Sequence, residues 1–159
     1  MKKLLQQRGY DNLDQAILEE LQQNGRMSVA DLARKIHLSQ PAVHNRIKRL
    51  EREGVIRQYV ALLDHQQIGY DLMCFLQLTL NPHSHEVIQA VRDQIQQEVV
   101  VLECYSISGR ADMLLKIIIE NQRALNDFIQ QLTKMDGIER IETALVLDYI
   151  KLTTELSLE

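Results

Sequence analysis

The chain has few residues of the kinds that build disulfide frameworks or metal centres. It contains two cysteines and no tryptophan among 159 residues. Cys74 and Cys104 lie far apart in apolar, strand-like runs, and no C-x-x-C pair is present. This usage predicts buried free thiols in a reducing cytoplasm, and it excludes a disulfide scaffold or a cysteine-based zinc site.

Long apolar runs are also absent. No stretch approaches the roughly 18 apolar residues that a membrane-spanning helix needs. Residues 1–8 lack the apolar core and the small-residue cleavage site of a signal peptide. We interpret this segment as a short, mobile polar arm, and we expect a cytoplasmic protein that has no membrane partner.

Motifs of the common enzyme classes are missing too. The chain has no G-x-S-x-G motif, no P-loop and no glycine-rich dinucleotide turn. His83 and His85 resemble a metal-binding pair, but two histidines in a loop before a helix are a weak signal, and solvation of the helix start explains them better. We therefore expect no catalytic activity, no cofactor and no metal site.

The strongest pattern is a pair of short helices between residues 28 and 54. Ser28 is suited to cap the first helix, and Ser39 to cap the second, which has Pro41 in its first turn. Gly54 suits the residue that follows its end. Apolar residues recur at helical spacing and predict one buried stripe on each helix: Val29, Leu32, Ala33 and Ile36, then Val43, Ile47 and Leu50.

The opposite face of the second helix is cationic and rich in hydrogen-bonding groups, which suits the major groove of DNA. Charged helix faces are usually just solvated, but the charge distribution favours a nucleic-acid contact. Residues 26–60 carry a net charge of +5, whereas residues 61–159 carry −8. The predicted contacts to double-stranded DNA are Ser39, Gln40, His44, Asn45, Arg46, Lys48, Arg49 and Arg52.

The remaining patterns predict an α+β protein with two domains. A helix over 12–25 precedes the helix pair, and a wing strand over 55–63 follows it, so residues 1–63 form a winged helix-turn-helix domain. Residues 64–69 form a linker. Residues 70–159 have the order βαββαβ of a ferredoxin-like domain. Its elements are expected at 72–80, 85–97, 99–108, 112–120, 124–135 and 138–150.

The predicted sheet is apolar on both faces. Its own two helices would cover one face only. Phe75, Leu115 and Ile117 are expected on the other face, which predicts that a second sheet or subunit packs there.

Several short motifs together carry a family resemblance along nearly the whole chain. The chain resembles the leucine-responsive/asparagine-responsive (Lrp/AsnC) transcription regulators. The resemblance implies a winged helix-turn-helix domain, a ferredoxin-like regulatory domain, and homodimers built through the regulatory sheets and often assembled into octamers. It also implies a small-molecule effector, such as an amino acid, bound between regulatory domains. The matching segments are Leu13-Asp14, Ile17-Leu18, Asn24-Gly25-Arg26, Leu32-Ala33, Leu38-Ser39, residues 43–51, Gly54-Val55-Ile56, Ser108-Gly109, Asp112, Leu114-Leu115 and Gly137-Ile138.

The effector site is expected around the hairpin turn that contains Gly109, Arg110 and Asp112. Backbone N–H groups of such a turn can face a ligand carboxylate, and the Asp112 carboxylate could hold an ammonium group. Alternatively, Asp112 closes the turn through a local hydrogen bond. The resemblance adds four positions to the site, which could equally be plain core: Thr133, Ala144, Leu145 and Val146.

Two positions depart from the family pattern. His37 stands where relatives commonly have glycine, and a left-handed conformation there is less favourable for histidine. Ala111 and Met113 flank Asp112 where relatives commonly carry an aromatic residue, which favours a bulky or extended effector.

Two other functions remain open at this point. A DNA-architectural protein would bind DNA without an effector. Sirohaem decarboxylases share the two-domain architecture, but their second hairpin is rich in His, Tyr, Arg and Trp, which this chain does not match. We predict a sequence-specific DNA-binding regulator.

Overall fold

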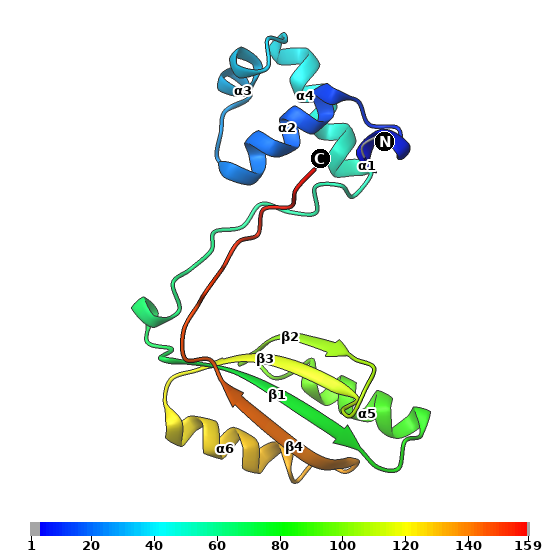
Figure 1. Cartoon of the computed structure of the whole chain (residues 1–159), viewed down its shortest axis with the longest axis vertical. Helices are drawn as coiled ribbons and strands as arrows, with labels where there is room; N and C mark the ends of the chain where they lie inside the picture. Colours follow the sequence, from blue (N-terminus) through cyan, green and yellow to red (C-terminus); the bar gives the residue numbers. More distant parts are fainter. Residues whose placement is uncertain (1–3, 159) are drawn as a thin grey trace. The chain divides into compact units, whose positions relative to one another are not determined.

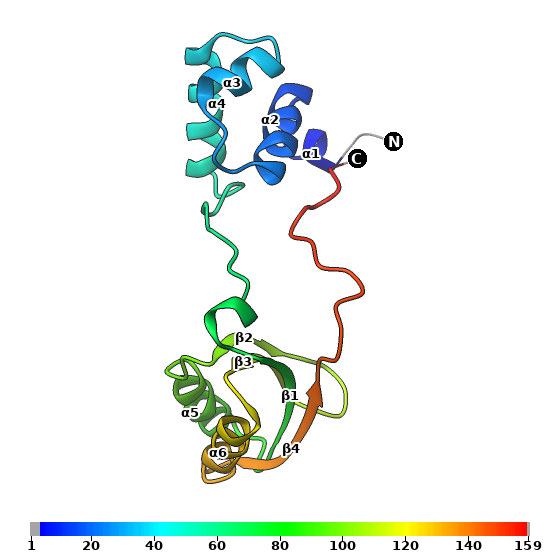
Figure 2. The ribbon, with the colours of Figure 1, turned by 90° about the vertical axis from the view of Figure 1, so that its left-hand side faces the viewer.

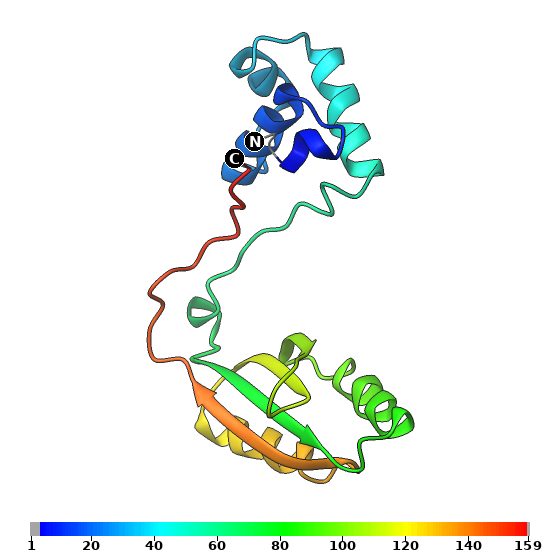
Figure 3. The same cartoon turned by 45° about the vertical axis from the view of Figure 1, so that its right-hand side comes forward.

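The computed structural model describes residues 4–158, which form two compact units (Figure 1). A helical unit contains the chain up to Leu62 and also the segment from Lys151 onward, while a sheet unit spans Leu63–Ile150. This differs from the expected second domain of 70–159, because the C-terminal segment belongs to the helical unit. Leu158 packs against the helical core, and Figure 3 shows this segment ending beside α2.

The helical unit contains four helices: α1 (Leu4–Gln7), α2 (Asn12–Gln23), α3 (Val29–Lys35) and α4 (Gln40–Arg52). The side chains of Ser28 and Ser39 cap α3 and α4 as predicted, and Asp11 caps α2. The apolar stripes of α2, α3 and α4 meet in one core. Its fully or nearly fully buried members are Ile17, Leu18, Leu32, Ala33, Val43 and Leu50.

The turn between α3 and α4 fixes the angle of the second helix. His37 has φ = 55°, the left-handed region that is uncommon for residues other than glycine. Gly54 ends α4 with φ = 72°. Both residues therefore take the positive-φ positions that the sequence pattern indicated.

Two sequence predictions in this unit are wrong. Residues 55–63 form no strand, because the N–H groups of Val55 and Ile56 bond to the carbonyl of Leu50 at the helix end and no second strand pairs with the rest. The polar arm is also partly structured, since α1 occupies its second half and Leu5 packs against the core. Residues 1–3 of that arm lie outside the described residues.

The sheet unit follows the predicted βαββαβ order after a short 3-10 turn, η1 (Gln66–Ile68). Its elements are β1 (Leu72–Leu80), α5 (His85–Ile95), β2 (Val101–Ser106), β3 (Met113–Ile119), α6 (Gln122–Leu132) and β4 (Ile138–Leu145). The antiparallel sheet has the order β2-β3-β1-β4, and both helices cover one face (Figure 2). β4 ends before the predicted residue 150, because its partner β1 begins at Leu72.

Strand register separates a buried face from an open face. Alternate residues of β1 and β3 pack under α5 and α6, and this set includes Leu115 and Ile117, which are fully buried. Our expectation that these two residues lie on the open face is therefore wrong by one step of the strand alternation. Phe75 does lie on the open face. The pairings Phe75↔Lys116, Gln77↔Leu114 and Met73↔Ile118 define that face.

Candidate nucleic-acid interface and effector site

Six of the eight predicted DNA contacts are exposed at the start or on the outer surface of α4. They are Ser39, Gln40, His44, Asn45, Lys48 and Arg52. The Ser39 hydroxyl accepts a hydrogen bond from the N–H of Ala42, so this residue is also the N-cap of α4. The buried Val43 and Leu50 fix the opposite face in the core. The structure therefore presents amide, imidazole, ammonium and guanidinium groups on one helix surface.

Arg46 and Arg49 are arranged differently, because both turn toward the buried Asp14 of α2. Arg46 Nη1 lies 2.8 Å from Asp14 Oδ1 and 2.9 Å from Asp11 Oδ1. Arg49 Nη2 lies 2.5 Å from Asp14 Oδ2. The Asp14 side chain is only 1% exposed. These two arginines thus depart from the expected outward placement, and the sequence signal that was missed is the Asp14 carboxylate on an otherwise apolar helix face.

The same cluster sets the protonation of its neighbours. Partial burial disfavours ionisation of Asp11, but hydrogen bonds from the backbone N–H of Asp14 and from Arg46 outweigh it and lower the pKa of Asp11. The hydrogen bond to Asp14 raises the pKa of Arg46. Arg49 also lies 5.7 Å from the ring centroid of Tyr10, within cation–π range.

Asp112 lies at the end of the β2–β3 hairpin turn, and its carboxylate is already bonded. Oδ2 accepts a hydrogen bond from the backbone N–H of Leu80 at 2.8 Å, and Oδ1 lies 2.8 Å from His83 Nε2. Neither contact is local to the hairpin turn, because Leu80 is the last residue of β1 and His83 lies in the loop that follows it, so the carboxylate joins the turn to that segment and does not form the local turn-closing bond of the alternative. Gly109 has φ = 129° and open space around its Cβ direction, so the turn uses the glycine as predicted.

The predicted effector residues fall into two groups. The first group lies near the end of β1. The N–H of Asp112 donates to the carbonyl of Leu78 there, and the α6–β4 connection that follows Thr133 reaches the same end of the strand. Ala144 pairs with Phe75, and Val146 N–H donates to Met73, so the second group lies near the start of β1. The groups are three to five residues apart along β1, about 10–16 Å at ~3.3 Å per residue. One chain therefore does not bring them into a single site.

The plain-core alternative does not describe these positions. Thr133 and Ala144 are exposed, Leu145 is 47% exposed and Val146 is half-buried. The Thr133 hydroxyl donates to the carbonyl of Gln130 at the end of α6. Leu145 and its neighbours are therefore available to a ligand or to another protein surface.

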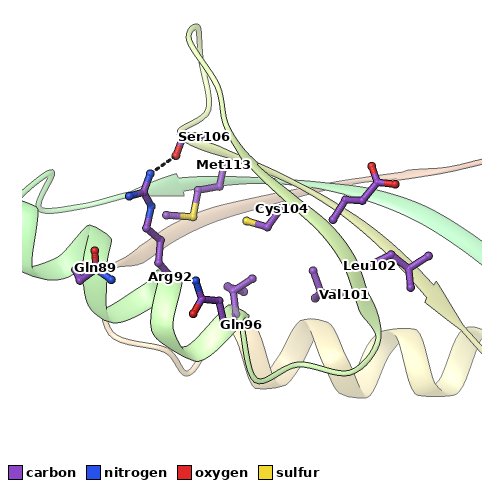
Figure 4. Close-up of a pocket in the computed structure, with 10 residues that line it drawn as sticks. Gln89, Arg92, Gln96, Val101, Leu102, Cys104, Ser106 and Met113 are labelled. Carbon is purple, nitrogen blue, oxygen red and sulfur yellow. Dashed lines mark hydrogen bonds between the residues drawn. The ribbon is translucent and has the colours of Figure 1, made fainter. Parts of the chain in front are cut away.

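A groove of about 470 Å³ runs between α5 and the edge strand β2 (Figure 4). Arg92 reaches across it and donates to the Ser106 hydroxyl at 2.6 Å. Cys104 also lines it and is an exposed residue, so our expectation that both cysteines are buried holds only for Cys74. Partial burial raises the pKa of the Cys104 thiol, and the nearby Arg92 charge opposes this shift.

Residues 4–158 contain no group of three or more His, Cys, Asp or Glu side chains placed to hold a metal ion. His83, one of the two candidate histidines, is instead the partner of Asp112. Over the same residues, no helix combines the length and the apolar character needed to cross a lipid bilayer.

The helical unit and the sheet unit together define a DNA-binding protein with a separate ligand-binding domain. Residues 10–57 match the family model of a winged helix-turn-helix DNA-binding domain, and residues 73–156 match that of the Lrp/AsnC ligand binding domain. The chain belongs to the Lrp/AsnC family of transcriptional regulators. Membership of a family of regulators also removes the decarboxylase alternative, so the chain is not an enzyme.

Similar proteins cover almost the whole chain. The leucine-responsive regulatory protein of Rhizobium meliloti is 34% identical over 142 residues, which are 89% of this chain and 91% of that protein. The leucine-responsive regulatory protein of Escherichia coli K12 is 31% identical over 92% of this chain and 90% of its own length.

Solved structures agree with this assignment. A transcriptional regulator from Neisseria meningitidis, solved as a complex with L-Met, has a TM-score of 0.90 at 29% identity and covers 94% of this chain and 97% of its own. E. coli AsnC has a TM-score of 0.84 at 28% identity, covering 92% of this chain and 97% of its own.

Proposed function

We propose that this regulator reads DNA with the outer face of α4 and that an amino acid or similar small effector, bound to the sheet unit, changes its DNA binding. The observation that carries the first part is the exposed set of hydrogen-bonding and cationic side chains on α4. The proposed base contacts are Gln40, His44 and Asn45, since their amide and imidazole groups can form hydrogen bonds with base edges. Ser39, Lys48 and Arg52 suit phosphate contacts.

The effector site is proposed to lie between two chains. The turn group contains Gly109, Arg110, Asp112 and Thr133, and the strand group contains Ala144, Leu145 and Val146. Because three to five residues of β1 separate these groups within one chain, a ligand that contacts both would have to lie where two sheet units meet. The L-Met complex of the Neisseria relative supports an amino acid as the effector class.

The open face of the sheet is proposed to join two copies into a homodimer. Met73, Phe75, Leu114 and Ile118 put apolar surface on that face, and no helix of the described chain covers it. The charges on the face are largely paired, because Lys116 Nζ lies 2.9 Å from Glu103 Oε1. Assembly of dimers into octamers and a cytoplasmic location remain part of this proposal.

The test has two stages. Full-length protein is first screened against the twenty amino acids by thermal shift, and each hit is followed by light scattering. DNA affinity is then measured with and without the hit, on a duplex that the protein selects from a random-sequence pool. A change in affinity or assembly supports the regulator. If no amino acid alters melting, assembly or affinity while the duplex still binds, the DNA-architectural function stands instead.

A further inference from the structure

Resting on the proposal that α4 reads DNA, we infer that Arg46 and Arg49 do not contact DNA. They are positioning residues that hold α4 against α2 through the buried Asp14. The assignment separates the cations of α4 into two classes. One class faces solvent, and the other is committed to the interior of the helical unit.

The geometry of the cluster fixes the orientation of α4. Each oxygen of Asp14 binds a different arginine, at 2.8 and 2.5 Å, and Oδ2 also accepts the N–H of Asp11 at 3.0 Å. Arg46 and Arg49 are three residues apart, so they lie on the same side of α4. Two attachment points on one helix restrict its rotation about its own axis as well as its distance from α2. That rotation decides which side chains face a DNA groove.

Burial makes these contacts hard to exchange for phosphate. The Asp14 carboxylate is 1% exposed, and a carboxylate left in such a place without its cations is strongly unfavourable. The Arg46 and Arg49 side chains are 25% and 36% exposed, well below the 75% of Arg52. A phosphate that took either guanidinium would therefore leave Asp14 under-compensated and would itself lie close to a like charge.

The cluster also contributes little to long-range attraction. Asp11, Asp14, Arg46 and Arg49 together have no net charge, and their separations are far shorter than the ~8 Å screening length at physiological salt. Lys48 and Arg52 remain as the cations of α4 that no buried carboxylate neutralises. The salt dependence of DNA binding should therefore report Lys48 and Arg52, and not Arg46 or Arg49.

The experiment measures DNA affinity of full-length variants at several salt concentrations, on the pool-selected duplex and on an unselected duplex of equal length. Lys48→Ala is the phosphate-contact control and should lower the slope of log K against log salt by about one unit. Arg46→Gln should leave the slope unchanged, lower affinity for the selected duplex about tenfold, and leave the unselected duplex nearly unaffected. Thermal melting establishes that each variant is folded at the assay temperature.

A double-mutant cycle gives the second readout. If Arg46 acts through Asp14, the pair Arg46→Gln with Asp14→Asn should weaken specific binding no more than Asp14→Asn alone, so the two effects are not additive. The conservative Arg46→Lys, which keeps a cation, should restore part of the specificity. Should Asp14→Asn fail to fold, the slope of Arg46→Gln alone decides the question.

Two results are informative in opposite ways. This inference would be overturned if Arg46→Gln reduced the slope by about one unit while Lys48→Ala also reduced it and Asn45→Ala weakened binding to the selected duplex. That outcome would leave α4 as the reading helix. Unchanged binding in both Lys48→Ala and Asn45→Ala would instead contradict the proposed function itself.

Discussion

Attachment of the C-terminal segment to α2 leads to a quantitative prediction. The Gln22 side chain forms two hydrogen bonds with the backbone of Leu156, donating to its carbonyl at 3.1 Å and accepting from its N–H at 2.7 Å. Gln23 makes one long contact of 3.4 Å with Glu155. The two glutamines are adjacent on one helix and have the same chemistry, so Gln23→Ala is a matched control for Gln22→Ala.

The expected effect follows from the number of bonds. A hydrogen bond contributes about 0.5–1.5 kcal/mol net, and these are exposed, so Gln22→Ala should weaken attachment by about 1–2 kcal/mol. Leu158, which packs on the helical core, should then be held less often. The same reasoning gives about 0.5 kcal/mol or less for Gln23→Ala, since its single contact is long and exposed.

Hydrogen exchange measured by mass spectrometry tests this directly. At 1.4 kcal/mol per factor of ten, exchange of the Leu156 amide in Gln22→Ala should be about 5–30-fold faster, if opening is at equilibrium. Gln23→Ala should change it by less than about threefold. Equal exchange rates in the two variants, or protection of the segment in both, would refute the attachment through Gln22.

Other consequences follow from the same structure. Asn45→Ala should relax base preference at one position of each half-site by about 1–3 kcal/mol, which selection from a random pool detects; a uniform loss of affinity would make Asn45 a backbone contact. Ile118→Asp on the open face should give a folded monomer in sedimentation, whereas Ile117→Asp in the core should unfold the sheet unit; a dimeric Ile118→Asp would remove that face from the interface. Because the pKa of Asp11 is lowered from 3.8, its contribution to stability is complete above that value and is lost as pH falls through the lower folded pKa. Thermal melting of wild type and Asp11→Asn should therefore converge in acid, and a constant difference down to the acid limit would contradict this reasoning.

Residue patterns predicted most of the fold because local rules agreed with tertiary packing. The caps Ser28 and Ser39, the positive-φ turn and the apolar stripes placed the helix pair, and the order of the later elements was also correct. The sequence was less informative about which face of each strand is buried. Leu115 and Leu114 are both apolar, so the sequence alternation alone does not decide which of them packs under the helices.

The site was less predictable than the fold, because it depends on contacts between distant segments. Arg46 and Arg49 look like exposed cations until Asp14, on another helix, is placed beside them. Asp112 looks unpaired in the sequence, but its carboxylate forms hydrogen bonds with Leu80 and His83 in the structure. The attachment of Leu158 to the helical unit likewise has no local signal, since Leu152 and Leu156 of the same tail are exposed and nothing in the sequence separates Leu158 from them.

The central claim is that effector binding in the sheet unit is coupled to DNA binding by the helical unit. The most direct measurement is the dissociation constant for the pool-selected duplex, determined by fluorescence anisotropy with and without a saturating amino acid from the thermal-shift screen. Coupling of ordinary strength predicts a change of about 5–150-fold and, by reciprocity, the same factor in the affinity for the amino acid when DNA is present. An amino acid that binds the protein but leaves both constants unchanged would contradict the account.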